Sequence, residues 1–152
     1  MKRFLSTLCA LLITTITAQV SAQEQEFETV MTPAFSPITW ERLVNAKDEP
    51  NNWLMYSGSL DAQRHSSLDE VNINNVSELE LKWAYQIPEI DRAETVPLVV
   101  DGIMFITEAP SKLVAVDART GRQYWRYNHE LPEDLRICCG RNNRGVAILG
   151  ET

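Results

Sequence analysis

The adjacent cysteines Cys138 and Cys139 carry the most distinctive chemistry of this chain. Neighbouring thiols can pair only by closing a small, strained ring, because adjacent Cα atoms lie about 3.8 Å apart and disulfides usually span about 4.4–6.8 Å. Such a bridge encloses no loop, so it adds almost nothing to stability through chain entropy. Its use would be local, as a rigid and flat sulfur surface against which a planar molecule lies. Two buried free thiols are the alternative, and for a bare Cys-Cys pair that alternative is favoured.

Residues 1–22 have the features of an export signal, which bears on the state of the two cysteines. A positively charged start precedes a mostly apolar stretch, and Val20-Ser21-Ala22 supplies small residues for cleavage, so the mature chain is predicted to begin at Gln23. The stretch is too short and too polar for a membrane span of about 20 apolar residues, and Cys9 lacks a lipoprotein box. The sequence therefore predicts a periplasmic or secreted protein without a membrane anchor. An oxidising compartment permits the cysteine pair to form a disulfide.

The composition is that of a soluble, acidic protein, with 44% hydrophobic and 23% charged residues. Removal of the two basic residues of the signal takes the formal net charge from −7 to −9. Nucleic acids and anionic membranes attract basic surfaces, so neither is expected as a partner.

The chain from Pro97 onwards has the pattern of four short antiparallel strands. Asp101-Gly102 is a strong hairpin signal, because both turn positions need a positive φ, and Thr120-Gly121 predicts a second turn. Four such strands within about 30 residues have the size of one propeller blade. Upstream, the pattern predicts an extended segment, a short helix capped by Thr39, one helical turn and a further strand. The predicted strands and segments are 98–100, 103–106, 112–116 and 123–127, with 23–37, 39–46, 74–79 and 81–85 before them.

The third and fourth strands carry an eleven-residue motif that runs from Ala115 to Trp125. Asp117 is placed to accept hydrogen bonds from loop amides, Gly121 permits a tight turn, and Trp125 offers a large flat surface to a neighbouring blade. The motif resembles the tryptophan-docking motif of the eight-bladed quinoprotein dehydrogenase propeller.

Other segments strengthen this resemblance, which extends from about residue 38 to the last residue. The segments 52–58, 63–66, 81–83 and 94–102, and the cysteine pair followed by Asn143-Arg144-Gly145, look like the N-terminal region of pyrroloquinoline quinone (PQQ)-dependent alcohol dehydrogenases. The resemblance implies an all-β fold, an eight-bladed β-propeller in a full-length parent. Residues 38–152 would supply its N-terminal part, with about one complete blade and flanking strands.

Four residues receive cofactor-binding roles from the resemblance. Cys138 and Cys139 would form a disulfide that stacks on one face of PQQ, and sugar-oxidising relatives generally lack this pair. Glu94 would reach the polar edge of the quinone through a carboxylate oxygen. Arg144 would donate hydrogen bonds to the ortho-quinone oxygens and stabilise negative charge there. The alternative for Glu94 and Arg144 is a solvated or salt-bridged loop residue.

The implied activity is the oxidation of small alcohols by hydride transfer to PQQ in the periplasm, with electrons passed to a cytochrome c. A calcium or lanthanide ion would assist, and its ligands and the aspartate base are expected beyond residue 152. No catalytic residue or metal ligand is therefore expected within this span, and the chain alone is expected to be inactive. A non-enzymatic propeller scaffold of the outer-membrane assembly type is an alternative, as is a secreted two-cysteine binding domain. The scaffold has no reason to keep Glu94, the cysteine pair and Arg144 together, and the binding domain does not explain the eleven-residue motif.

Overall fold

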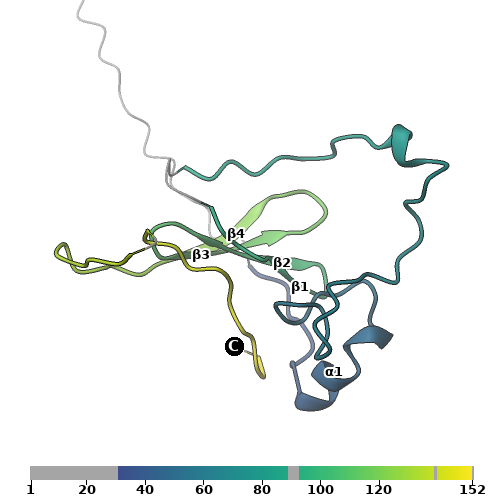
Figure 1. The fold of residues 1–152 in the computed structure, drawn as a ribbon, viewed down its shortest axis with the longest axis horizontal. Helices are drawn as coiled ribbons and strands as arrows, with labels where there is room; N and C mark the ends of the chain where they lie inside the picture. The colour runs from purple at the N-terminus through teal and green to yellow at the C-terminus, as the bar shows by residue number, and fades with distance from the viewer. Residues whose placement is uncertain (1–30, 89–92, 139, 152) are drawn as a thin grey trace, which may run out of the picture.

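A computed structural model describes residues 31–88, 93–138 and 140–151, and its centre is one antiparallel sheet (Figure 1). Four strands lie in the order β1-β2-β3-β4, so each strand pairs with its neighbours in sequence. This arrangement confirms the four strands predicted from the sequence. The strands are β1 (Leu98–Val100), β2 (Ile103–Glu108), β3 (Lys112–Asp117) and β4 (Gln123–Asn128), preceded by helices α1 (Trp40–Val44), η1 (Ala46–Asp48) and η2 (Val76–Glu78). The predicted signal peptide and the first part of the segment 23–37 lie outside the described residues.

The turn between β1 and β2 has the predicted geometry and also anchors the N-terminal segment. Asp101 and Gly102 have φ values of 48° and 87°. The Asp101 carboxylate accepts a hydrogen bond of 2.8 Å from the backbone N–H of Ser36 and one of 3.1 Å from the Arg42 guanidinium of α1. Arg42 also forms a two-pronged ion pair with Glu49 at 2.8 and 2.6 Å, which lowers the pKa of the Glu49 carboxyl. Residues 36–49 are thereby fixed to the β1–β2 turn.

The turn between β3 and β4 confirms the role predicted for Asp117. Its Oδ1 accepts hydrogen bonds from the backbone N–H groups of Arg119 at 2.7 Å and Thr120 at 3.3 Å. These bonds, above all that from Arg119, lower the pKa of the Asp117 carboxyl. A Cβ atom on Gly121 would lie 2.5 Å from the Trp83 ring, so a residue with a side chain cannot replace this glycine without displacing the indole.

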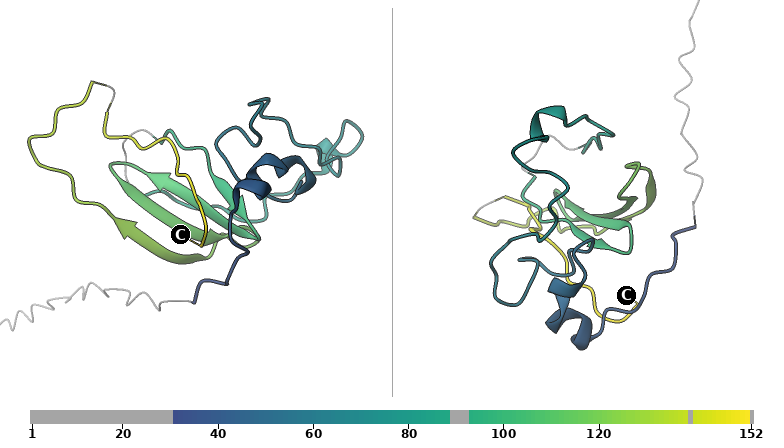
Figure 2. Two further views of the ribbon diagram at one scale, coloured as in Figure 1. Left: turned by 90° about the horizontal axis from the view of Figure 1, so that it is seen from below. Right: turned by 90° about the vertical axis from the view of Figure 1, so that its right-hand side faces the viewer.

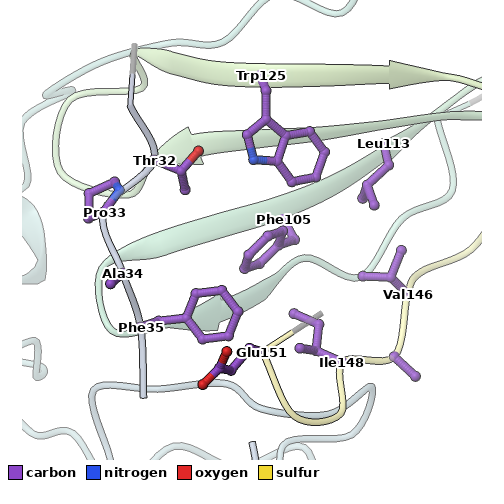
Figure 3. Close-up of a pocket in the computed structure, with 11 residues that line it drawn as sticks. Thr32, Pro33, Ala34, Phe35, Phe105, Leu113, Trp125, Val146, Ile148 and Glu151 are labelled. Atoms are coloured by element: carbon purple, nitrogen blue, oxygen red, sulfur yellow. The ribbon is translucent and has the colours of Figure 1, made fainter. Parts of the chain in front are cut away.

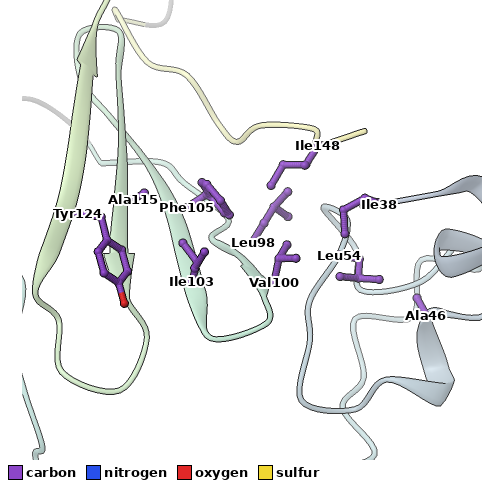
Figure 4. Packing of buried hydrophobic residues seen from close by; sticks show 10 residues of the cluster. All are labelled: Ile38, Ala46, Leu54, Leu98, Val100, Ile103, Phe105, Ala115, Tyr124 and Ile148. Atoms are coloured by element: carbon purple, nitrogen blue, oxygen red, sulfur yellow. The ribbon is translucent and has the colours of Figure 1, made fainter. Parts of the chain in front are cut away.

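The core lies on one face of the sheet, under the N-terminal segments (Figure 4). Ile38 and Leu54 pack against Leu98 and Val100 of β1, and Ile148 approaches the same strand from the C-terminal side. Two backbone bridges fix this arrangement: Ile38 pairs with Gly150, and Trp53 pairs with Val99. The full buried cluster is Ile38, Ala46, Leu54, Leu98, Val100, Ile103, Phe105, Ala115, Tyr124 and Ile148.

The opposite face of the sheet is apolar as well. Ile106, Val114 and Val116 form a second buried cluster there, with Tyr85 and Met104 packed against it. A sheet with two apolar faces is expected to pack between two other layers, as a propeller blade does.

The segment between residues 60 and 88 leaves the sheet as a long loop (Figures 1 and 2). Residues 61–74 are all exposed, and the predicted helical turn is confirmed as η2. The strand predicted from the alternation of Leu81, Trp83 and Tyr85 is wrong, since residues 79–88 have no regular secondary structure. Trp83 and Tyr85 do turn toward the sheet, and Leu81 is exposed, so the alternation is correct. A strand also requires a backbone partner, which the described residues do not offer this segment.

Candidate cofactor site

Glu94 and Arg144 lie far apart in sequence and meet in the fold. The Arg144 Nε atom is 3.0 Å from Glu94 Oε2, and the backbone N–H of Val96 donates a hydrogen bond of 3.0 Å to the carbonyl of Arg144. The two side chains are 65% and 37% exposed for Arg144 and Glu94. Exposed ion pairs contribute little to stability, about 0–1 kcal/mol. The salt-bridged alternative for these residues is therefore confirmed, and the structure places both predicted cofactor ligands side by side.

The loop after β4 contains the remaining predicted ligands. Cys138 is exposed in this loop, and Cys139 lies outside the described residues, so the predicted disulfide stays a prediction. Gly140 follows with a φ of 91°, a conformation that glycine adopts without strain.

Asn142 in the same loop is a residue whose role sequence reasoning missed. Its side-chain amide nitrogen and oxygen are both buried and have no hydrogen-bond partner among the described residues. Leaving a buried amide unpaired costs about 1–3 kcal/mol. Asn142 lies two residues before Arg144, so this amide has unused hydrogen-bonding capacity beside the ion pair. The signal in the sequence was its place between the cysteine pair and Arg144.

A buried polar network at the end of β2 was also missed. Glu108 is fully buried, and its Oε1 accepts a hydrogen bond of 2.7 Å from the Tyr85 hydroxyl. The Arg126 Nη2 atom lies 3.3 Å from Glu108 Oε2 and 2.7 Å from the Tyr85 hydroxyl. Burial, together with the nearby Glu108 carboxylate, raises the pKa of Tyr85. A glutamate that ends an apolar strand was the available signal, since strand alternation places it on the face of Ile106.

A hollow of about 570 Å³ lies on the core side of the sheet, away from Glu94 and Arg144 (Figure 3). The Trp125 ring borders it, and Phe105 lies between Trp125 and Phe35 with ring centres 6.1 and 6.0 Å away. None of the four predicted cofactor residues lines this hollow. Its lining is Thr32, Pro33, Ala34, Phe35, Phe105, Leu113, Trp125, Val146, Ala147, Ile148 and Glu151.

Two further features of the described part of the chain bear on the site. It contains no group of three or more histidine, cysteine or acidic residues placed to hold a metal ion. It also contains no helix that is long and apolar enough to cross a membrane.

Comparison with known proteins identifies the class of protein to which this geometry belongs. The family described as "Glucose/ethanol/alcohol dehydrogenase, beta-propeller domain", a PQQ family, matches residues 53–152. The chain therefore belongs to the PQQ-dependent quinoprotein alcohol dehydrogenases, and the predicted all-β propeller class is confirmed.

Individual relatives agree with this family. The quinoprotein ethanol dehydrogenase of Pseudomonas aeruginosa is 40% identical over 116 residues, which cover 75% of this chain and 19% of that protein. The 1-butanol dehydrogenase (quinone) of Thauera butanivorans is 38% identical over 120 residues, covering 78% and 19%. A solved quinohemoprotein alcohol dehydrogenase of Pseudomonas putida HK5 superimposes with a TM-score of 0.70 at 35% identity, covering 78% of this chain and 18% of that one. The chain thus spans about a fifth of the length of these relatives.

Proposed function

We propose that this chain forms one wall of the PQQ site in a periplasmic enzyme that oxidises small alcohols. The observation that supports the proposal most is the pairing of Glu94 with Arg144 beside the Cys138 loop, in a member of a PQQ-dependent family. PQQ is a planar ortho-quinone that carries carboxylates and, when bound, accepts two electrons from the alcohol. The chemistry of the site suits such a group, because a cationic fork, a carboxylate and an unpaired buried amide lie within one loop cluster.

Arg144 is proposed to hold the polar edge of the cofactor. A guanidinium donates in one plane to two neighbouring oxygens and offsets negative charge on them, which a lysine ammonium does not do in the same geometry. The Glu94 carboxylate contacts the Nε atom and so orients the plane of the fork. Glu94 is also proposed to reach the cofactor itself, and the Asn142 amide is placed to complete a further hydrogen bond in this loop.

Cys138 and Cys139 are proposed to form a disulfide that lies against one face of the cofactor. The exposure of Cys138 is compatible with a contact surface. The electron acceptor is proposed to be a cytochrome c, and a calcium or lanthanide ion is proposed to bind outside residues 31–151. On this proposal, the chain alone with PQQ and metal oxidises no alcohol, since the base and the metal site lie elsewhere in the complete enzyme.

The test compares two arginines of the same loop in the complete enzyme. Arg144→Lys is expected to lower turnover in dye-linked alcohol oxidation at least tenfold and to weaken PQQ binding, while folded yield stays close to wild type. Arg141→Lys is the matched control, with the same change three residues earlier in the loop. Equal effects of the two substitutions, or a wild-type enzyme that does not bind PQQ, would overturn the proposal.

A further inference from the structure

Thr107 connects the two loops that carry Glu94 and Arg144. Its side chain belongs to β2 and is only 2% exposed. Its Oγ1 atom lies 2.6 Å from the carbonyl oxygen of Asn143 and 2.9 Å from Oγ1 of Thr95. The backbone N–H of Thr107 also donates to Thr95 Oγ1, at 3.3 Å. One residue of the sheet thus contacts the residue beside Glu94 and the residue beside Arg144.

The proton positions in this cluster follow from the chemistry of the groups. A carbonyl oxygen can only accept, so the single hydroxyl proton of Thr107 is donated to Asn143. The hydroxyl of Thr95 then donates to Thr107 and accepts from the Thr107 backbone N–H. Every one of these buried polar groups has a partner, and each partner depends on the hydroxyl of Thr107. A residue of the same shape without the hydroxyl leaves the Asn143 carbonyl without this donor.

The ion pair itself is too exposed to fix its own geometry. An exposed pair of two long side chains contributes about 0–1 kcal/mol and loses part of that to side-chain entropy. The relative placement of Glu94 and Arg144 is instead set by their backbones, which are joined by the Thr107 contacts and by the Val96–Arg144 hydrogen bond.

We propose that Thr107 is a positioning residue, which holds the Glu94 and Arg144 loops at the separation that PQQ binding requires. This inference rests on the proposed function, because it assigns a role toward the same cofactor. Thr107 acts through its neighbours Thr95 and Asn143.

The experiment uses two substitutions of Thr107 in the complete enzyme. Thr107→Val removes the hydroxyl and keeps the shape of the side chain, whereas Thr107→Ser keeps the hydroxyl. Tyr85→Phe is the control, since it removes a hydroxyl that contacts Glu108 on the other face of the same strand. Two quantities are measured: the hydrogen exchange rate of the Val96 amide in cofactor-free enzyme, and the PQQ dissociation constant by equilibrium dialysis.

Thr107→Val is expected to raise the Val96 exchange rate and the PQQ dissociation constant about tenfold each, the effect of roughly one to two lost hydrogen bonds. Thr107→Ser is expected to stay within about threefold of wild type in both. Tyr85→Phe is expected to lower the thermal midpoint and leave the PQQ dissociation constant of the folded enzyme unchanged.

The outcomes separate this inference from the proposed function. A Thr107→Val enzyme with wild-type exchange at Val96 and wild-type PQQ affinity overturns the inference and leaves the proposed function standing. Equal losses in Thr107→Val and Thr107→Ser overturn it too, because they assign the effect to packing rather than to the hydroxyl. A wild-type enzyme that binds no PQQ overturns the proposed function and the role of Thr107 with it.

Discussion

The buried Glu108 carboxylate makes a sharp prediction about stability. Arg126 is the cation that faces it, with Nη2 at 3.3 Å, and Tyr85 donates to its other oxygen at 2.7 Å. Arg126→Met removes the positive charge and keeps much of the side-chain volume. The carboxylate is then left fully buried with a neutral donor and no cation in contact.

The magnitude follows from the difference in burial between the two partners. Glu108 has no exposed surface, whereas the Arg126 side chain is 25% exposed and can reach water without its partner. Loss of the cation should cost about 3–5 kcal/mol, the usual effect of leaving a buried charge uncompensated. Glu108→Gln removes the charge and keeps an oxygen for Tyr85, so it should cost about 1–2 kcal/mol. The double variant should recover much of the loss seen in Arg126→Met alone, because it contains no buried charge.

Thermal unfolding of the cofactor-free enzyme, followed by tryptophan fluorescence, measures these effects. The order of the midpoints is the test rather than a free energy, because proteins above about 150 residues seldom unfold in one step. We expect Arg126→Met to be the least stable, the double variant to be intermediate and Glu108→Gln to be nearest to wild type. If Arg126→Met is as stable as Glu108→Gln, Arg126 does not compensate the carboxylate, and the reasoning is refuted.

Three other predictions concern the cysteines, the blade and pH. Mass spectrometry of freshly isolated protein should find a deficit of two hydrogens on the peptide with Cys138 and Cys139 and no alkylation before reduction; free thiols there would contradict the stacking role. Trp125→Ala should reduce folded yield, at a cost of up to about 3–5 kcal/mol, and leave the specific activity of the folded fraction unchanged; the reverse pattern would assign Trp125 to the chemistry. Because the pKa of Asp117 is lowered in the folded state, its carboxylate stabilises the fold above the ordinary carboxyl range, and this contribution is lost as the pH falls through the folded pKa. Asp117→Asn should therefore lower the unfolding midpoint at pH 7 and converge on wild type below about pH 3, and a gap that does not narrow in acid would contradict this.

Local chemistry made the blade predictable from sequence. Asp101-Gly102 and Thr120-Gly121 specify turns through the backbone angles that they allow, and the strands between them follow. The strand expected at 81–85 failed because side-chain alternation does not supply a backbone partner. The pairing of Glu94 with Arg144 could not be read from spacing either, since it depends on how the loop after β4 returns to β2. Glu108 was missed because a charged residue at a strand end is usually at the surface.

The bridge between Ile38 and Gly150 has a consequence for the order of folding. Each hairpin of the sheet closes a turn of a few residues, whereas this bridge joins positions about 110 residues apart. By loop-closure entropy it costs about 2 kcal/mol more to form than a ten-residue hairpin. Nor can it form during synthesis before Gly150 has left the ribosome. The four strands can therefore zip together on their own as the chain emerges, and Ile38 reaches its burial site late, as a latch on a sheet that already exists.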